Sequence, residues 1–237
     1  MTAPALATAP EPTRIVATCH GIGVPDAPHL RPGMIAAMQS GGYERHELTI
    51  GLAAIRPGAR ILELGAGSGV VGAVLARHCA PAAMLAIEAN PHLLPHIKAL
   101  YAYNGLTHRI SLQHGVVLTA PDAPDTVTFY VTGNFLGSGL TPQKPERSVA
   151  VTVPVLPYTA LKAAFPHDTI MMDIEGGELD FLRHADLSGV DTFIAELHRP
   201  IYGREGMAEI RTLLQTAGLV FDDAASMAGV HLYRRAG

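Results

Sequence analysis

Residues 60–72 read Arg-Ile-Leu-Glu-Leu-Gly-Ala-Gly-Ser-Gly-Val-Val-Gly, an apolar run that breaks into three alternating glycines and then resumes with apolar spacing. This pattern predicts a strand, a tight turn and then a helix over 70–78. Glycines at positions 65, 67 and 69 allow backbone conformations closed to other residues, and a ligand can lie directly against their peptide groups. The turn therefore predicts a binding site for a flat, polar ligand.

The spacing of the glycines separates two classes of nucleoside cofactor. Glu63 stands two positions before the first glycine, and Gly-x-Gly-x-Gly resembles the first motif of S-adenosylmethionine-dependent methyltransferases. The dinucleotide fingerprint has its third glycine one step later, where this chain has Val70. The candidate cofactor-binding residues of this turn are Glu63, Gly65, Gly67, Ser68 and Gly69.

Length and composition favour one α/β domain with appendages. The chain has 237 residues, and its 48% hydrophobic content with 24 glycines suits a buried parallel sheet. The formal net charge is −4, and no basic run occurs, which argues against a nucleic-acid backbone as the main partner. Small or neutral substrates are favoured instead.

The N-terminus and the cysteines indicate a soluble cytoplasmic protein. Residues 1–14 predict a disordered tail, because alternating Ala, Pro and Thr offer little to bury, and they lack the basic start and apolar segment of a secretory signal. Cys19 and Cys79 have no metal-ligand spacing and are expected to be unpaired thiols. No apolar run is long enough to cross a bilayer, so no membrane association is expected.

The remaining chain divides into three predicted parts. Residues 15–58 predict an N-terminal helical cap that begins with a short edge strand at 15–18, and the α/β core follows over residues 59–237. Within the core, residues 119–157 depart from the αβ alternation, because two strand-like stretches surround a Gly-rich loop. This β-hairpin insertion is too long for an ordinary connection, and we expect it to cover the substrate. Its candidate hydroxyl partners are Asn134, Ser138 and Thr141.

Glu88 ends the second predicted strand and is followed by Asn90-Pro91, which predicts the start of a helix. An acid about 20 residues after the glycines, at the carboxyl end of a parallel strand, is placed to accept both hydroxyls of a ribose. A solvated carboxylate at the strand end is the alternative. The neighbouring Ala89, with Gly115 and Val116 after the third strand, are candidate residues for the rest of the nucleoside.

Two further apolar strands, at 169–172 and 192–195, both end in acids. Period-two geometry puts Asp173 and Glu175 on one side of the first strand, and Glu196 and His198 on one side of the second. These groups should converge, and acids buried at strand ends persist only with a cation, an amine or a shared proton.

Five motifs in this order resemble the FkbM family of methyltransferases. They are Gly42-Tyr43-Glu44 with Glu47, the glycine turn, residues 87–91, residues 172–178 and residues 195–198. The resemblance implies a class I methyltransferase fold, Rossmann-like, with a mostly parallel seven-stranded sheet and helices on both faces. It also implies S-adenosyl-L-methionine as cofactor and methyl transfer to a hydroxyl, often on a sugar or polyketide. Tyr43, Glu44 and Glu47 are expected to close over the cofactor, with a position at the surface as the alternative, and Asp173 is a further candidate cofactor-binding residue. The first motif departs from the family, which usually has Asp-x-Gly-Ala-Asn.

Methyl transfer to a hydroxyl needs the oxygen deprotonated and in line with the carbon–sulfur bond. A divalent cation would favour that deprotonation, so Asp173, Glu196 and His198 are candidate catalytic residues and ligands of Mg²⁺ or Mn²⁺. Alternatively, His198 is a metal-free general base oriented by Asp173 or Glu196. Glu175 is expected to cap the next helix or bind the cofactor's amino group, and Glu178 to be structural.

Three functional classes follow from these observations. The first is an S-adenosylmethionine-dependent O-methyltransferase that acts on a small polar acceptor, with a sugar or oligosaccharide favoured. The second is an NAD-dependent oxidoreductase, which the glycine spacing disfavours. The third is a cofactor-binding module without activity. A homodimer is compatible with apolar residues on the N-terminal helices.

Overall fold

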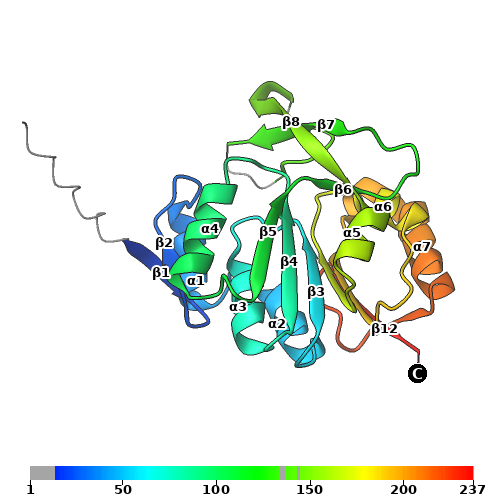
Figure 1. The fold of residues 1–237 in the computed structure, drawn as a ribbon, viewed down its shortest axis with the longest axis horizontal. Helices are drawn as coiled ribbons and strands as arrows, with labels where there is room; N and C mark the ends of the chain where they lie inside the picture. The colour runs from blue at the N-terminus through cyan, green and yellow to red at the C-terminus, as the bar shows by residue number, and fades with distance from the viewer. Residues whose placement is uncertain (1–13, 134–136, 143–144, 237) are drawn as a thin grey trace, which may run out of the picture.

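The computed structural model describes residues 14–133, 137–142 and 145–236. Except for Arg14, the predicted tail at 1–14 lies outside the described residues. A seven-stranded sheet runs through the centre of the protein in the order β11-β12-β10-β9-β3-β4-β5 (Figure 1). Its strands are β3 (Arg60–Leu64), β4 (Ala83–Glu88), β5 (Ile110–His114), β9 (Thr169–Met172), β10 (Thr192–Glu196), β11 (Leu219–Phe221) and β12 (Val230–Arg235).

The order of the strands creates a crevice at the middle of the sheet. From β3 the chain moves outward through β4 to β5, and it then crosses to the other side of β3 to form β9. All strands run parallel except β12, which is antiparallel to both β10 and β11. In an open parallel sheet the place where the winding reverses is where ligands bind, beyond the carboxyl ends of the strands. Here that place lies between β3 and β9.

Helices cover both faces of the sheet, as expected for strands that are apolar on both sides. Helices α2, α3 and α4 contribute to one hydrophobic cluster, and α5, α6 and α7 contribute to the other. The helices are α1 (Pro32–Ser40), α2 (Arg45–Ala54), α3 (Val70–His78), α4 (Leu94–Tyr103), α5 (Tyr158–Ala164), α6 (Glu178–His184) and α7 (Arg199–Thr216).

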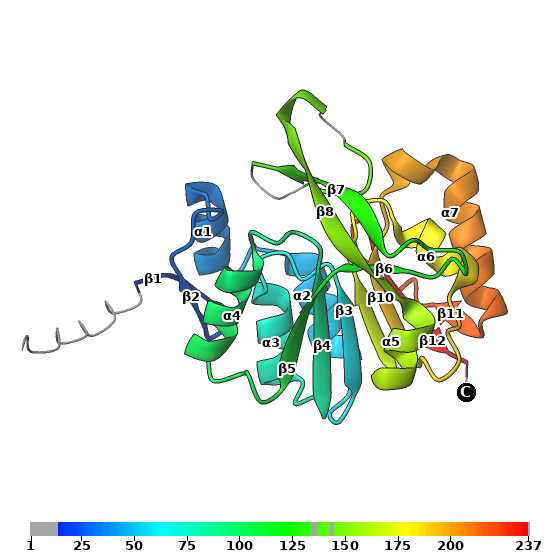
Figure 2. The same ribbon diagram turned by 45° about the horizontal axis from the view of Figure 1, so that its top comes forward.

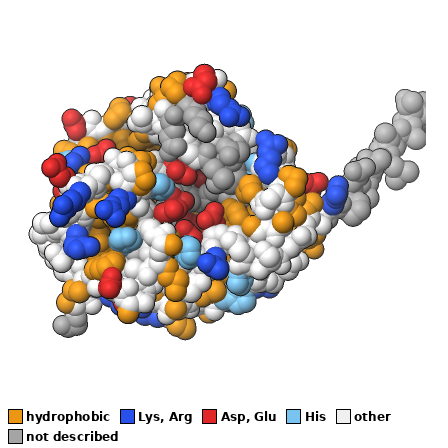
Figure 3. Space-filling view, turned by 180° about the vertical axis from the view of Figure 1, so that it is seen from behind, with side chains coloured by type: hydrophobic (Ala, Val, Ile, Leu, Met, Phe, Trp, Pro, Cys, Tyr) orange, Lys and Arg blue, Asp and Glu red, His pale blue; other side chains and the backbone are white. Residues whose placement is uncertain are grey.

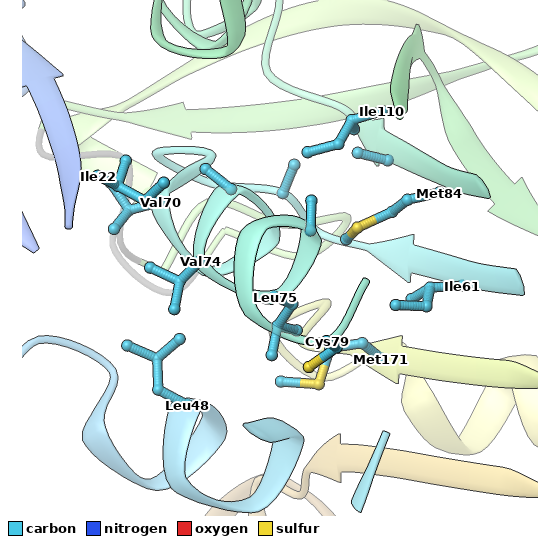
Figure 4. Close-up of a cluster of buried hydrophobic side chains, with 14 of the residues drawn as sticks. Ile22, Leu48, Ile61, Val70, Val74, Leu75, Cys79, Met84, Ile110 and Met171 are labelled. Carbon is cyan, nitrogen blue, oxygen red and sulfur yellow. The ribbon is translucent and has the colours of Figure 1, made fainter. Parts of the chain in front are cut away.

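The two clusters use alternate residues of the same strands. On β3, Ile61 belongs to the cluster under α2 and α3, while Leu62 belongs to the cluster under the opposite helices. Figure 4 shows the first cluster, in which Leu48 of α2 and Val74 of α3 lie with Ile61 and Met171 of the sheet. The helices beside the crevice are therefore held to the sheet by continuous apolar packing.

Residues 15–58 are only partly helical. Before α1 and α2 the chain forms an antiparallel pair of strands, β1 (Ile15–Cys19) and β2 (Ile22–Pro25), which make a separate two-stranded sheet. The predicted edge strand therefore pairs with its neighbour in sequence and not with the main sheet. Buried residues of β1, β2, α1 and α2 belong to the same cluster as β3, so this region is part of the core.

The predicted insertion forms a small sheet above the carboxyl ends of the central strands (Figure 2). Its strands are β6 (Val116–Leu118), β7 (Thr126–Thr132) and β8 (Ser148–Pro157), with the 3₁₀ turn Pro145–Arg147 before β8. β7 and β8 pair antiparallel over seven residues each, as the hairpin prediction requires, and β6 pairs parallel with β8.

Two helix boundaries differ from the sequence prediction. Asn90 does not begin the fourth helix: its side chain accepts a hydrogen bond from the backbone N–H of His92 at 3.0 Å and closes a turn, and α4 starts only at Leu94. The sequence predicts the last long helix over 206–217, but α7 starts at Arg199, because it continues through a bend at Gly203, whose φ is +64°.

Within the part of the chain that the structure describes, no helix combines the length and the apolar character needed to span a membrane.

Candidate active site

A cavity of about 230 Å³ lies beyond the carboxyl ends of β3, β4 and β9. Its wall includes the glycine turn after β3, the start of the segment after β4, residues 115–120, and the segment after β9. Figure 3 shows Asp and Glu side chains gathered in a hollow on one face of the protein. The cavity therefore occupies the crevice that the strand order predicts for a ligand.

The glycine turn has the conformation that its sequence predicts. Gly65, Gly67 and Gly69 have φ values of +87°, +55° and +78°, which favour glycine. Gly65 also lies against the next strand segment, because a Cβ there would collide with the carbonyl oxygen of Asp173. The turn thus passes directly beside the residue that follows β9, and it leads into α3 at Val70.

Glu88 is held against this turn. Its carboxylate accepts the backbone N–H of Gly67 at 2.7 Å and that of Asn90 at 2.6 Å. Burial raises the pKa of Glu88 to about 7, although these N–H donors act in the opposite direction. The side chain lines the cavity at the end of β4, which is the position that the sequence predicts for a ribose-binding acid.

Glu63 lies beneath the turn rather than beside open solvent. It is almost fully buried, and its carboxyl group packs so closely on Gly72 of α3 that a Cβ there would collide with it. Burial, reinforced by the nearby Glu88, raises the pKa of Glu63 to about 8. Glu63 therefore carries a proton at neutral pH when the cavity holds no ligand.

This protonation makes the stability of the protein depend on pH. The folded state raises the pKa of Glu63 from 4.5 to about 8, so the folded state binds more protons in that interval and its free energy of unfolding falls as pH rises from 4.5 towards 8. We expect Glu63→Gln to flatten this decline by at most about 1.4 kcal/mol per pH unit. The measurement is the melting temperature between pH 5 and pH 8 without cofactor.

The control is Glu205→Gln, the same exchange at an exposed position of α7. A decline that is equally steep in wild type, Glu63→Gln and the control would contradict a protonated Glu63.

The acids after β9 converge with the histidine after β10. The parallel register pairs Ala195 with Met172, so the segments after both strands leave the sheet at the same edge. His198 Nε2 lies 3.4 Å from Glu175 Oε2 and 4.0 Å from Asp173 Oδ1. One ligand atom from each of Asp173, Glu196 and His198 falls within 4.8 Å of the others.

The carboxylate of Glu178 orients the side chain of His198. The Glu178 side chain is fully buried, accepts the backbone N–H of Ile174 at 3.1 Å and the hydroxyl of Tyr202, and lies 3.4 Å from His198 Nδ1. This carboxylate raises the pKa of His198 to about 9, against the effect of burial. Burial alone would raise the pKa of Glu178, but His198 and Tyr202 lower it. Glu178 is therefore charged and forms an ion pair with His198.

The contacts of Glu175 exclude one of its two expected roles, and those of Glu178 agree with a structural role. Glu175 does not cap α6: one carboxylate oxygen accepts the backbone N–H of Gly137 from the insertion at 3.1 Å, and the other faces His198. Glu178, expected to be only structural, accepts backbone N–H groups of the loop before α6 and contacts His198. Nothing in the local sequence distinguishes the two glutamates, because the difference arises from the packing of α6 against α7.

Glu44, from the Gly42-Tyr43-Glu44 motif, is a further acid of the cavity wall. It precedes α2 with φ of +42°, and it lines the cavity with Glu47, three residues later. Burial raises the pKa of Glu44 to about 7, and the nearby Glu47, Glu196 and Glu175 act in the same direction. The Gly-Tyr-Glu sequence before α2 was the only local signal for it.

The predicted cofactor-binding residues gather around one cavity. Tyr43 lies over the glycine turn, where its hydroxyl is 2.9 Å from Ser68 Oγ. Gly69, Glu196 and His198 do not line the cavity, although Glu196 and His198 each have a ligand atom within 4.8 Å of one on Asp173, which does line it. The residues that do line it are Tyr43, Glu47, Glu63, Gly65, Gly67, Ser68, Glu88, Ala89, Gly115, Val116 and Asp173.

The chain is similar to solved structures of methyltransferases at low sequence identity. No curated protein matches it significantly. Among solved structures it is similar to a precorrin-6y C5,15-methyltransferase from Geobacter metallireducens, with 12% identity and a TM-score of 0.47 over 81% of this chain and 88% of that one. It is also similar to a tRNA methyltransferase from B. subtilis, with 14% identity and a TM-score of 0.47 over 80% of this chain and 65% of that one.

The family model of the methyltransferase FkbM domain matches residues 63–221, about two thirds of the chain. The matched region begins at the acid before the glycine turn and contains Glu88, Asp173 and His198. This match favours methyl transfer over the oxidation that the glycine turn alone also allowed. The chain therefore belongs to the FkbM methyltransferase family and is an S-adenosylmethionine-dependent methyltransferase with a class I, Rossmann-like fold.

Proposed function

We propose that this protein transfers the methyl group of S-adenosyl-L-methionine to a hydroxyl of a small polar acceptor, with a sugar or oligosaccharide favoured. The observation that carries the proposal is the meeting of Asp173, Glu196 and His198 within 4.8 Å, beside the glycine turn. A cluster of acids and an imidazole supplies what an alcohol needs before it can attack a methyl group, namely a site for its proton or for a cation.

The acceptor would enter beneath the insertion. Phe129 of β7, with Ser138 and Leu140 from the loop that follows β7, lines the cavity. Of the three expected hydroxyl partners, Ser138 is buried at the cavity and Thr141 is exposed, while Asn134 lies outside the described residues. The insertion thus offers both apolar and polar groups to an acceptor, which supports a role in acceptor binding.

The reaction breaks the carbon–sulfur bond of the cofactor and forms an oxygen–carbon bond to the acceptor, which loses its hydroxyl proton. Asp173 lines the cavity, and His198 Nε2 lies 4.0 Å from Asp173 Oδ1. Asp173 is therefore the residue best placed to orient the hydroxyl. The hydroxyl proton would pass to a carboxylate of this cluster when a cation is bound, or to the deprotonated imidazole of His198 in the metal-free version.

The donor set of this cluster fits a divalent cation. Asp173 Oδ1 has no hydrogen-bond partner among the described residues, and burial raises the pKa of Asp173 well above its usual value, with Glu196 and Glu175 adding to the effect. Such a carboxylate gains most from a neighbouring positive charge. Asp173, Glu196 and the neutral form of His198 would hold Mg²⁺ or Mn²⁺, and binding of the cation would release the imidazole proton. The cation would supply a Lewis acid that lowers the pKa of an alcohol.

The metal-free alternative makes a different prediction about pH. The Glu178 carboxylate raises the pKa of His198 to about 9, so the imidazole is protonated at neutral pH and cannot accept a proton. If His198 is the general base, the rate should rise with pH through about 9, because only the deprotonated imidazole is active.

A chelation experiment separates these two versions. We expect treatment with a chelator to lower methyl transfer by at least about 10²-fold at pH 7.5, and Mg²⁺ or Mn²⁺ to restore it. The control is S-adenosylhomocysteine affinity, which should not change with chelation. If turnover is undiminished after chelation and the rate rises through pH 9, the cation is not required and His198 is the general base.

The acceptor is tested directly by incubating the protein with cofactor carrying a labelled methyl group and a panel of sugars and other alcohols. Mass spectrometry should detect a product heavier by one methylene unit, and fragmentation should place the label on oxygen. Label found only on nitrogen or carbon would contradict O-methyl transfer.

A further inference from the structure

The first turn of α7 brings two side chains to the same buried carboxylate. His198 precedes the helix, and its carbonyl oxygen accepts the backbone N–H of Tyr202 at 3.2 Å. The two residues are four positions apart, so within one helical turn their side chains lie on the same face. That face meets α6. His198 Nδ1 lies 3.4 Å from Oε1 of Glu178, and the hydroxyl of Tyr202 donates to Oε2 of the same carboxylate.

Gly203 sets this turn apart from the rest of α7. Its φ of +64° and ψ of −165° lie in a region that is essentially restricted to glycine. An added Cβ at Gly203 would meet no atom within 4 Å, so the backbone conformation, and not a lack of space, requires the glycine. Beyond the bend, Ile210 and Leu214 are buried in the hydrophobic cluster of the sheet. The first turn of α7 therefore has a direction of its own against α6.

The carboxylate of Glu178 is held in one orientation by its hydrogen bonds. Its Oε1 atom accepts the backbone N–H of Ile174 at 3.1 Å, and its Oε2 atom accepts the hydroxyl of Tyr202. The same hydroxyl accepts the backbone N–H of Glu178 at 3.0 Å, so Tyr202 fixes both the backbone and the side chain of this residue. Because the Glu178 side chain has no exposed surface, water does not replace a lost hydrogen bond there.

The position of Glu178 determines how the imidazole of His198 is turned. Nδ1 of the ring faces Glu178, and Nε2 lies 3.4 Å from Glu175 Oε2 and 4.0 Å from Asp173 Oδ1. A carboxylate that holds one ring nitrogen of a histidine fixes the direction of the other, whether that nitrogen binds a cation or accepts a proton. Glu178 thus turns Nε2 towards Asp173, which lines the cavity.

We infer that Tyr202 is a positioning residue for methyl transfer: its hydroxyl holds the Glu178 carboxylate, which in turn holds His198 with Nε2 towards Asp173. This inference rests on the proposed function, in which His198 is a cation ligand or a general base. Tyr202 does not line the cavity, so it acts through Glu178 and not by contact with cofactor or acceptor. The bend at Gly203 is the backbone feature that allows Tyr202 to take this place.

The orientation of His198 is tested first without an acceptor. The protein is saturated with S-adenosylhomocysteine and treated with a chelator at pH 7, and exchange of the imidazole N–H protons with water is followed by nuclear magnetic resonance. The proton on Nδ1 of His198, assigned by its absence in His198→Gln, should exchange slowly in wild type because it faces the buried Glu178. Tyr202→Phe should accelerate this exchange by about 10-fold or more, the effect of one lost hydrogen bond to a charged group.

Tyr103→Phe is the matched control, because it removes the hydroxyl of an exposed tyrosine at the end of α4. It should leave the exchange rate of the His198 proton at the wild-type value. An exchange rate that is the same in Tyr202→Phe and in the control would overturn the inference.

Kinetics separate positioning from a general loss of structure. With an alcohol that the labelled-methyl panel identifies as acceptor, Tyr202→Phe should lower kcat about 10-fold, while the KM for the acceptor and the affinity for S-adenosylhomocysteine stay within about threefold of wild type. In a His198→Gln background the same substitution should lower the rate no further, because a residue that acts through His198 then has nothing to position. Equal losses in the two backgrounds would show that Tyr202 is only structural and overturn the inference.

Failure of the inference is distinguishable from failure of the proposed function. If an alcohol is methylated on oxygen and Tyr202→Phe has the kcat of wild type, O-methyl transfer stands and the role of Tyr202 does not. If the His198 proton exchanges faster in Tyr202→Phe but no alcohol of the panel is methylated on oxygen, Tyr202 does position His198 and the proposed function itself is wrong.

Discussion

Replacing His198 by Gln is expected to lower the kcat of methyl transfer by about 10²- to 10⁴-fold, the range typical of a lost proton-transfer group or of a lost cation ligand. His198 lies 3.4 Å from Glu175 and 4.0 Å from Asp173, so its removal changes the charge beside the proposed position of the acceptor hydroxyl. It does not line the cavity, and the affinity for S-adenosylhomocysteine should therefore stay within about threefold of wild type.

The measurement is single-turnover methyl transfer at saturating cofactor, with calorimetry for cofactor affinity. His184→Gln is the control, because it makes the same exchange at an exposed position at the end of α6. The His198→Gln substitution also removes the charged partner of Glu178, so a loss of activity could result from unfolding. Urea unfolding of His198→Gln should show a cooperative transition, and a variant that keeps more than about a tenth of the wild-type rate would remove His198 from the chemistry.

Replacing Gly65 by Ala should have the second large effect, a loss of measurable cofactor binding. The φ of +87° strains any residue with a Cβ, and the added Cβ would collide with the carbonyl oxygen of Asp173. The turn after β3 and the segment after β9 would have to separate, and both contribute to the cavity wall. We expect the free energy of unfolding to fall by more than about 4 kcal/mol, a loss typical of strain combined with overpacking.

Gly58→Ala is the matched control for this variant. Gly58 has a similar φ of +78°, but an added Cβ there meets no atom within 4 Å. It should therefore show the backbone strain alone, about 1 kcal/mol, and normal cofactor affinity. Urea unfolding and calorimetry with S-adenosylhomocysteine measure both quantities. Equal losses in the two variants would show that strain, rather than the contact between the turn and Asp173, determines the effect.

Local features of the site could be predicted from sequence because they depend on residues close in the chain. The three glycines predict positive φ values wherever they lie, and Glu88 follows its strand directly, so its position at the ligand edge needs only the direction of β4. The acids after β9 and β10 were predicted to converge by the same reasoning. The position of Asn90 was the weak point, because a turn closed by its own side chain competes with a helix cap.

The partners of the catalytic candidates could not be predicted in this way. Glu178 contacts His198 only because α6 packs against α7, which also brings the hydroxyl of Tyr202 to Glu178. Glu44 and Glu47 reach the cavity because α2 packs on α3 and beside β10, elements far from it in sequence. The binding of the insertion to Glu175 through Gly137 likewise joins segments 38 residues apart.

The sequence by itself determined the α/β class, the cofactor turn and the edge of the sheet at which the chemistry gathers, because strand direction and glycine spacing are local properties. Only the tertiary structure decided which acids share one space. Their charge and protonation depend on burial and on neighbours brought together by helix packing, and no local pattern encodes these distances.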